Sequence, residues 1–412
     1  MESLLHRLGP AAAAAFVMAL APFAPALQGP DEPDGAVLRA PGLESLELGG
    51  QLRLRFESRD PAPPTTAGRS MSNGSARIRL HLDAVLDDTF GAFVQFQESI
   101  ASQGSVSMSS VRQAVGRARG LADGRLDLEA GRMELNYGMQ RMISPLDWSQ
   151  TGRAWDGGRA IFREGEIRAD LFWTQAVQNQ GAPYGGVDFG GVYAQWAGDP
   201  ITVDVYALRR RDEMIGVSDT TLGALLRGAY DGWNWHAEGA SQSGDHGPLD
   251  AGGYAVAAGI EHVFRCGSRL GARYELASGD ADPTDGQDDT FRLLFDFGHA
   301  YQGHADIVRW QNLQDIVVTA SVPAGGGFDV HSDLHLLSLH ERADALYPGA
   351  GAAGATASGS ASDLGTEVDV YVKGPLGDSV AMWAGVSQFF AGDALAAGDD
   401  QTWIFVQGVL SF

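Results

Sequence analysis

The sequence is almost without lysine and cysteine: of its 412 residues, one lysine (Lys373) and one cysteine (Cys266) are present. A single cysteine cannot form an internal disulfide, and we expect Cys266 to be a small buried residue without a redox role. Beyond the N-terminus, no run approaches the roughly 18 apolar residues of a membrane-spanning helix. These absences exclude a disulfide framework and a helical membrane bundle. They leave open a membrane-spanning β-barrel, which hides its apolar residues by alternation.

Positive charge is also scarce relative to negative charge, and the formal net charge is therefore −23 at pH 7. This balance argues against nucleic acid as a partner. It does not decide what a pore would carry, since external loops and lumen are separate surfaces. No Ser/His/Asp or Cys/His arrangement with a recognisable spacing is present, so we expect no enzymatic activity. An acyl hydrolase in the outer membrane is the alternative.

The N-terminus has the pattern of an export signal. His6 and Arg7 precede an apolar run, and Ala24-Pro25-Ala26 supplies small residues for a cleavage site. We therefore predict a signal peptide at residues 1–26, a flexible leader at 27–44 and a single barrel domain at 45–412. A retained anchor helix is the alternative for the first segment.

The last ten residues, WIFVQGVLSF, alternate along a strand. Ile404, Val406, Leu410 and Phe412 fall on one side, and Trp403, Phe405 and Gln407 on the other. An apolar face that ends on phenylalanine is typical of a strand that closes a membrane barrel, where lipid meets the outer face. A core strand of a soluble sandwich is the other interpretation.

The same period of two recurs along the chain and predicts 18 strands. The connections alternate between short turns, such as Asp87–Gly91 and Asp231–Gly232, and long loops, such as Met133–Asp156 and Ala277–Leu313. Arg117–Gly124 is the poorest of the short ones. In a soluble β-sandwich, short and long connections are not expected to alternate regularly along the chain. The pattern predicts an all-β, up-and-down antiparallel transmembrane barrel with short periplasmic turns and long external loops, in a Gram-negative-type outer membrane.

Two of the long loops carry unusual sequence, and both resemble the alginate export family of 18-stranded outer-membrane barrels. In the first loop the matching residues are Gly131, Arg132, Glu134, Leu135, Gly138, Gln140, Arg141, Pro145, Leu146, Asp147, Trp148, Arg153, Asp156 and Gly157. In the second they are Ser278-Gly279-Asp280, Asp285-Gly286, Thr290-Phe291, His299, Gly303, Asp306 and Trp310-Gln311-Asn312. The resemblance implies a porin-like channel for an acidic polysaccharide or another anionic solute, with periplasmic secretion partners as a further expectation.

A uronate polymer carries one carboxylate on each sugar, so its passage needs fixed positive charge on the pore wall. Arginine suits this role because it stays charged and binds carboxylates bidentately. The candidates for pore lining and substrate binding are Arg53, Arg55, Arg77 and Arg79 on the first strands, and Arg132, Arg141, Arg153 and Arg159 around the first long loop. If that loop folds into the lumen, these arginines form a constriction. Acidic residues on other inward faces leave a lumen of balanced ion pairs as the alternative.

The second long loop also contains a cluster of aspartates, and no other cofactor is expected. Asp280, Asp282, Asp285 and Asp288 are candidates for binding Ca²⁺, because aspartates near glycine offer oxygen ligands in a tight loop. The spacing does not match an EF-hand, and a solvated acidic loop is the alternative.

Overall fold

The structure is a computed structural model that describes residues 36–38, 42–61, 70–101, 108–177, 187–353, 355–396 and 400–412. The predicted signal peptide at 1–26 and most of the predicted leader at 27–44 lie outside these residues. Among the residues described, no helix has the length and apolar composition needed to cross a bilayer.

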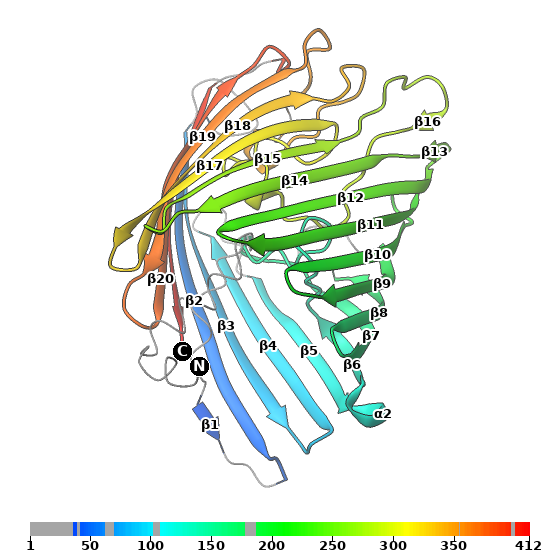
Figure 1. Cartoon of the computed structure of the whole chain (residues 1–412), viewed down its shortest axis with the longest axis vertical. Coiled ribbons are helices and arrows are strands. Elements are labelled where there is room, and N and C mark those ends of the chain that lie inside the picture. The colour runs from blue at the N-terminus through cyan, green and yellow to red at the C-terminus, as the bar shows by residue number, and fades with distance from the viewer. Residues whose placement is uncertain are drawn as a thin grey trace.

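The described residues form one sheet of 21 strands, and removing three short strands from that number leaves 18 in the wall of a closed barrel. The three short strands are β1 (Ala36–Leu38), β13 (Leu249–Ala251) and β16 (Gln287–Asp288). The wall strands are β2 (Ser45–Asp60), β3 (Met71–Val85), β4 (Phe90–Ala101), β5 (Met108–Gly120), β6 (Leu126–Met133), β7 (Trp155–Glu164), β8 (Ile167–Ala176), β9 (Val187–Ala197), β10 (Ile201–Asp212), β11 (Val217–Tyr230), β12 (Trp233–His246), β14 (Tyr254–Val263), β15 (Arg269–Ala277), β17 (Leu313–Gly325), β18 (Phe328–Leu339), β19 (Asp363–Pro375), β20 (Val380–Ala391) and β21 (Gln401–Ser411). Figure 1 shows them wound around a common axis in chain order. The predicted 18-stranded antiparallel barrel is confirmed.

The barrel closes where its last strand meets its first. β2 pairs antiparallel with both β3 and β21. The N–H of Phe412 donates to the carbonyl of Gly50 at 3.0 Å, and the N–H of Gly50 donates to the carbonyl of Phe412 at 2.7 Å. The terminal phenylalanine therefore completes the ladder, which leaves no open edge at the seam.

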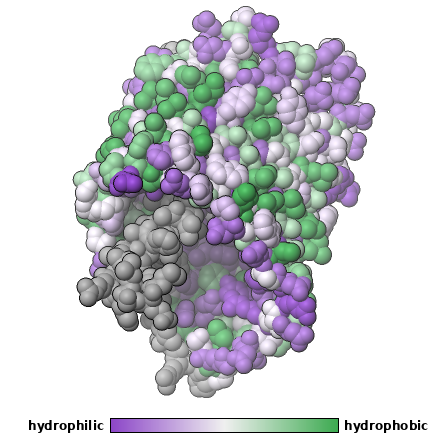
Figure 2. All heavy atoms as spheres, viewed as in Figure 1, coloured by the Kyte–Doolittle hydropathy of each residue, from purple (hydrophilic) through white to green (hydrophobic). Residues whose placement is uncertain are grey.

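Alternation sorts the side chains of each strand between the outside and the lumen. On β21, Ile404 is 50% exposed and points outward, whereas Phe405 is 2% exposed and points inward. On β2, Leu54 and Phe56 are exposed, whereas Arg53 and Arg55 are buried in the lumen. Figure 2 shows hydrophobic residues over much of the outer face and hydrophilic residues on the wall of a recess. An apolar exterior and a charged interior are what a barrel in lipid requires.

The short connections are tight turns, as their sequences predict. Asp231 and Gly232 join β11 to β12, and both have positive φ, 49° and 79°. Asp-Gly in this conformation matches the twist of a two-residue hairpin. The poorest predicted turn, Arg117–Gly124, is shorter than expected because β5 continues to Gly120, and only α2 (Leu121–Gly124) and Arg125 separate it from β6.

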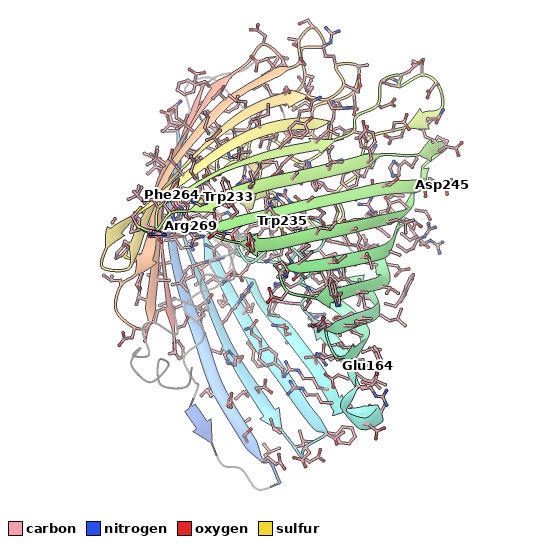
Figure 3. The ribbon with its side chains drawn as sticks, in the orientation of Figure 1. Glu164, Trp233, Trp235, Asp245, Phe264 and Arg269 are labelled. Atoms are coloured by element: carbon pink, nitrogen blue, oxygen red, sulfur yellow. The ribbon has the colours of Figure 1, made fainter. Side chains whose placement is uncertain are left out.

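Exposed aromatic residues lie near both ends of the wall. Trp173 is 58% exposed near the long-loop end of β8, whereas Trp196, Tyr230 and Trp233 are exposed near the short-turn ends of their strands. In Figure 3, Trp233 lies near one end of β12, and Asp245 lies at the opposite end. These positions fit aromatic girdles at the two membrane interfaces.

Cys266 corrects one expectation, because it is exposed rather than buried. It lies in the short turn between β14 and β15, where its Sγ donates to the Ser268 hydroxyl at 3.4 Å. Side chains of a turn that projects beyond the barrel have no neighbouring strand to cover them.

Candidate functional site

Two of the long connections fold into the barrel instead of projecting away from it. We call residues 134–154, between β6 and β7, the first inward loop, and residues 278–312, between β15 and β17, the second inward loop. Leu135 and Ile143 of the first loop and Phe291 and Trp310 of the second are buried in one apolar cluster. Burial of this much apolar surface holds both loops inside the lumen. The lumen is therefore narrowed to the space beside the loops.

Backbone hydrogen bonds also join the two loops to each other. The N–H of Ser144 donates to the carbonyl of Phe295 at 2.8 Å, and the N–H of Phe295 donates to the carbonyl of Met142 at 3.0 Å. The two loops therefore form one unit, and a displacement of either one strains the other.

Five arginines from the barrel wall converge on the first inward loop, and we call them the arginine cluster. They are Arg53 and Arg55 of β2, Arg77 and Arg79 of β3, and Arg112 of β5. All five are buried. Four of them were predicted as pore residues from the alternation of their strands. Sequence reasoning missed Arg112, because a β-bulge opposite Gln95 and Phe96 interrupts the alternation there.

Asp147 is the anion at the centre of the arginine cluster. Its Oδ1 lies 2.5 Å from Nη1 of Arg79 and 3.1 Å from Nη1 of Arg77, and its Oδ2 lies 3.9 Å from Nη1 of Arg53. Burial would raise the pKa of Asp147, but the guanidiniums of Arg79, Arg77 and Arg53 outweigh it and hold this pKa well below its usual range. The carboxylate is therefore ionised at neutral pH.

Backbone carbonyls of the first inward loop satisfy much of the remaining donor capacity of the cluster. Arg53 donates to the carbonyls of Asp147 at 2.6 Å and Ser149 at 2.7 Å, and Arg55 donates to that of Trp148 at 2.6 Å. Arg112 donates to the carbonyl of Pro145 at 3.1 Å and pairs with Glu134 at 2.8 Å. The cluster therefore anchors the first inward loop and also gives the wall of the lumen a net positive charge.

Trp148 links the wall to both inward loops. The guanidinium of Arg55 lies 3.5 Å from its ring centroid, and the ring of His299 is stacked on it at 4.0 Å. Two groups this close to one ring must occupy its opposite faces. Leu146, with a φ of 51°, makes the sharp bend that directs Asp147 and Trp148 to these partners. The Pro-Leu-Asp-Trp segment thus forms the docking point of the loop.

The other four predicted arginines occupy separate places. Arg141 is buried across the lumen, 2.9 Å from Glu275 and 3.9 Å from Glu238, with its guanidinium 3.6 Å from the ring centroid of Tyr301. Burial lowers the pKa of Arg141, but Glu275 and Tyr301 outweigh it, so the pKa is raised.

Arg153 donates to the carbonyl of Asp296 at 2.6 Å and so joins the two inward loops. Arg159 faces the lumen on β7 and pairs with Glu129. Arg132 shares the outer face of β6 with Leu128 and makes a bidentate pair with Asp156 at 2.8 and 2.9 Å. Its position is therefore outside the lumen.

Carboxylates of the opposite wall hold the second inward loop. Glu367 of β19 accepts a hydrogen bond from the N–H of Ala305 at 2.7 Å, and Asp369 accepts one from the N–H of His304 at 3.3 Å. Burial, aided by the nearby His299, lowers the pKa of His304 to about 3, so its ring is neutral at pH 7. The lumen thus has a basic side that holds one loop and an acidic side that holds the other.

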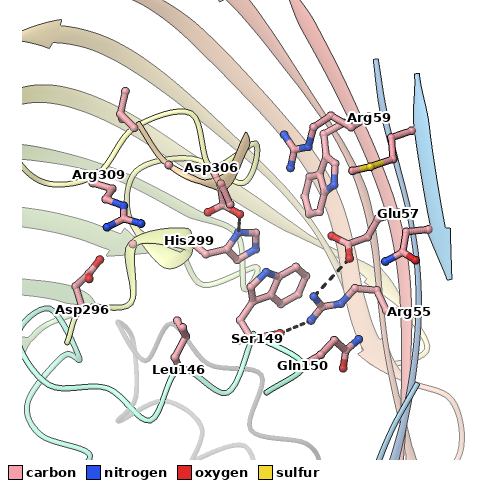
Figure 4. A pocket seen from close by; sticks show the side chains of 18 of the residues that line it. Arg55, Glu57, Arg59, Leu146, Ser149, Gln150, Asp296, His299, Asp306 and Arg309 are labelled. Carbon is pink, nitrogen blue, oxygen red and sulfur yellow. Dashed lines mark hydrogen bonds and ion pairs between the residues drawn. The ribbon is translucent and has the colours of Figure 1, made fainter. Parts of the chain in front are cut away.

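A pocket of about 490 Å³ opens where the inward loops meet the long-loop end of β2, and we call it the mouth pocket. Its charged lining consists of four arginines (Arg55, Arg59, Arg153 and Arg309) and three acids (Glu57, Asp296 and Asp306). Figure 4 shows Arg309 and Asp296 on one side of it and Arg55, Glu57 and Arg59 on the other. Sequence reasoning did not single out Arg59 or Arg309, since their use depends on how the second loop folds.

The predicted calcium ligands do not converge in this structure. Asp280 accepts from the N–H of Asp282, Asp285 accepts from the N–H of Gln287, and Asp288 pairs with Arg292 and His246. Asp282 accepts hydrogen bonds from Thr284. Across the described part of the chain, no group of three or more acidic, histidine or cysteine side chains is placed to hold a metal ion. Calcium binding by this loop stays a prediction for isothermal titration.

Two residues of the second loop motif have a structural explanation. A Cβ on Gly279 would lie 2.1 Å from Oδ1 of Asn312. Nδ2 of Asn312 donates to the carbonyls of Glu341 at 2.9 Å and Ala345 at 3.0 Å, and its Oδ1 accepts from the N–H of Glu341 at 2.7 Å. Asn312 therefore ties the base of the second inward loop to the next long loop, and only glycine fits beside it.

A closed barrel with an apolar outer face, two inward loops and a charged lumen defines an outer-membrane protein of the porin type. The chain belongs to the alginate export family, whose model matches residues 44–408. The comparison with curated proteins found no match.

Solved outer-membrane channels share the fold at low sequence identity. OccK5 (OpdH) of Pseudomonas aeruginosa has a TM-score of 0.65 and 11% identity, over 90% of this chain and 100% of that one. OccK2 (OpdF) of the same organism, solved in complex with glucuronate, has a TM-score of 0.62 and 14% identity, over 90% and 99%. OccAB4 of Acinetobacter baumannii has a TM-score of 0.61 and 10% identity, over 90% and 100%.

Proposed function

We propose that this outer-membrane channel passes carboxylate-bearing saccharides, and that its physiological cargo is an alginate-like acidic polysaccharide on its way out. The arginine cluster is the observation that carries this proposal. Its five guanidiniums share three carboxylates, those of Asp147, Glu57 and Glu134, which leaves the cluster with a formal excess of two positive charges. Fixed positive charge of this kind lowers the energy of an anion beside it in a narrow passage.

The mechanism is passive diffusion. A uronate carboxylate that leaves bulk water loses hydration, and attraction to the net positive charge of the cluster offsets part of that loss. Because the arginines are buried against the first inward loop, they attract a chain of uronates through their net charge and bind no single uronate tightly. Passage requires no catalytic step. Periplasmic secretion partners, if used, would dock on the end with the short turns.

Passage of a small anionic solute is the second candidate. The two inward loops fill much of the lumen, which favours a solute smaller than a polymer, and one structural neighbour was solved with the monosaccharide glucuronate. The two candidates share the arginine wall and differ in the size of the cargo.

Charge reversal in planar bilayers tests both candidates together. We expect the wild-type channel to prefer chloride over potassium in a salt gradient, and Arg53→Glu combined with Arg79→Glu to abolish that preference. The matched control is Arg211→Glu combined with Arg265→Glu, which changes the charge equally at exposed positions away from the lumen. Unchanged selectivity in the first pair contradicts the proposal.

Added oligouronate separates the two candidates. A polysaccharide channel responds to oligouronates of several sugars with current blocks that lengthen with chain length. A small-solute channel is blocked by glucuronate but shows no dependence on chain length.

A further inference from the structure

Resting on the proposed function, we propose that the mouth pocket is a binding site for a single sugar acid, with Arg309 as the residue that captures its carboxylate. The site is distinct from the arginine cluster, whose other members lie deeper along β2, β3 and β5; only Arg55 belongs to both.

Arg309 is the arginine of the pocket whose guanidinium is available to bind a ligand. Arg55 is held by Gln407 and Trp148, Arg59 donates to the carbonyl of Ala305 at 2.6 Å, and Arg153 donates to that of Asp296. The side chain of Arg309 is exposed and makes no hydrogen bond or ion pair with any residue that the structure describes. In Figure 4 its guanidinium points toward the space between the loops and β2. Among the described residues its guanidinium has no bidentate partner and is open to a ligand from solution.

The acids of the pocket define the rest of the ligand. Glu57, Asp296 and Asp306 keep 27%, 18% and 23% of their side chains exposed, so acceptor oxygens remain open to the pocket. Carboxylates repel a simple anion but accept hydrogen bonds from hydroxyl groups. One spare guanidinium beside several open acceptors fits a molecule with one carboxylate and several hydroxyls, which is the composition of a hexuronate.

The size and backbone of the pocket agree with this assignment. Its volume of about 490 Å³ lies within the range of small-molecule sites. Leu146 and Asp306, which both line the pocket, have positive φ values of 51° and 55°. Such backbone is maintained only where the surroundings fix it, and it gathers at binding sites. The two loops thus build a rigid wall around a space that fits one sugar unit or the end of a chain.

The test is calorimetric titration of the purified wild-type barrel and its Arg309→Gln variant with D-glucuronate, D-glucose and acetate. We expect the wild type to bind glucuronate more tightly than either of the others, and Arg309→Gln to weaken glucuronate binding about tenfold, because a charge-assisted hydrogen-bond pair is lost. Arg309→Lys, which keeps the charge without the fork, is expected to fall between the two. Arg211→Gln, an exposed arginine outside the pocket, is the matched control and is expected to bind as the wild type does.

Equal glucuronate affinity in wild type and Arg309→Gln overturns the inference, as does an equal loss for glucose. Reversal potentials of the same preparations separate this result from the proposed function. An anion-selective channel with unchanged glucuronate affinity refutes the pocket and leaves the channel proposal standing. Glucuronate binding that depends on Arg309 in a channel without anion preference supports the pocket and refutes the arginine wall.

Discussion

Replacing Asp147 by asparagine is expected to raise the anion preference and the conductance of the channel together. The carboxylate contacts Arg79, Arg77 and Arg53 at 2.5, 3.1 and 3.9 Å. The change removes the central anion of the arginine cluster, so its formal excess of positive charge rises by one. It also removes part of what holds the first inward loop against β2 and β3.

The size of both effects follows from this geometry. Breaking a buried ion pair costs about 3–5 kcal/mol. The Asp147 side chain is 32% exposed, and the arginine bonds to the carbonyls of Asp147 and Ser149 remain, so we expect a loss of about 1–2 kcal/mol in loop anchoring. A unit change of charge about 4 Å from a passing ion in water stabilises chloride and destabilises potassium by about 1 kcal/mol each, which corresponds to at most roughly a thirtyfold rise in the chloride-to-potassium permeability ratio.

The assay is single-channel recording in a potassium chloride gradient. The control is Asp245→Asn, because Asp245 is exposed at the long-loop end of β12 and outside the lumen (Figure 3). A lower anion preference in Asp147→Asn, or a shift no larger than that of the control, would refute the assignment of Asp147 as the counter-ion of the cluster.

Three further predictions concern the anchoring of the two inward loops. Arg141→Met removes the cation that the buried carboxylates of Glu275 and Glu238 share, and leaves Glu275 with Arg273 at 3.4 Å. It is expected to lower stability by about 3 kcal/mol, seen as a lower melting temperature than that of the control Arg211→Met. Gly279→Ala places a Cβ 2.1 Å from Asn312 and is expected to cost about 1–3 kcal/mol and to open the second loop to protease, whereas Gly239→Ala, with no atom within 4 Å of its Cβ, leaves both unchanged. Burial raises the pKa of Asp306, but His299 and Arg59 outweigh it, so the pKa is lowered. The contribution of Asp306 is then present above about pH 4 and is lost as the pH falls through the lowered pKa, so conductance should stay level from pH 8 to 5 and change only below about pH 4, less so in Asp306→Asn.

The wall of the barrel was predictable because its physics is local. Alternation on β2 and β21 places Leu54 and Ile404 outside and Arg53 and Phe405 inside. Because lipid surrounds the barrel and water fills it, the apolar face of every strand must point outward, which fixes the orientation of the whole sheet. The regular succession of short and long connections then predicted which end of the barrel faces the periplasm and which faces outward. The prediction that Arg53, Arg55, Arg77 and Arg79 face the lumen rests on the same alternation.

The interior was less predictable because it depends on how the long loops fold. Nothing local to Arg141 indicates that it crosses the lumen to Glu275, since the two lie far apart in sequence and meet only when the first loop enters the barrel. Arg132 shows the converse, because its strand continues regularly and carries it to the outer face beside Asp156. The motif residues Asp147, Trp148, Gly279 and Asn312 turned out to hold the loops in place, a role that only the folded arrangement reveals.

The most direct test of the arginine-lined passage is the reversal potential of the wild-type channel in a tenfold salt gradient, before and after oligouronate is added. The proposed function predicts a reversal potential of the sign given by a chloride-selective channel, and this potential moves toward zero as the polyanion enters the passage and offsets the positive charge of the arginine cluster. A potential on the potassium side, as the overall charge of −23 would produce if it governed the lumen, contradicts it.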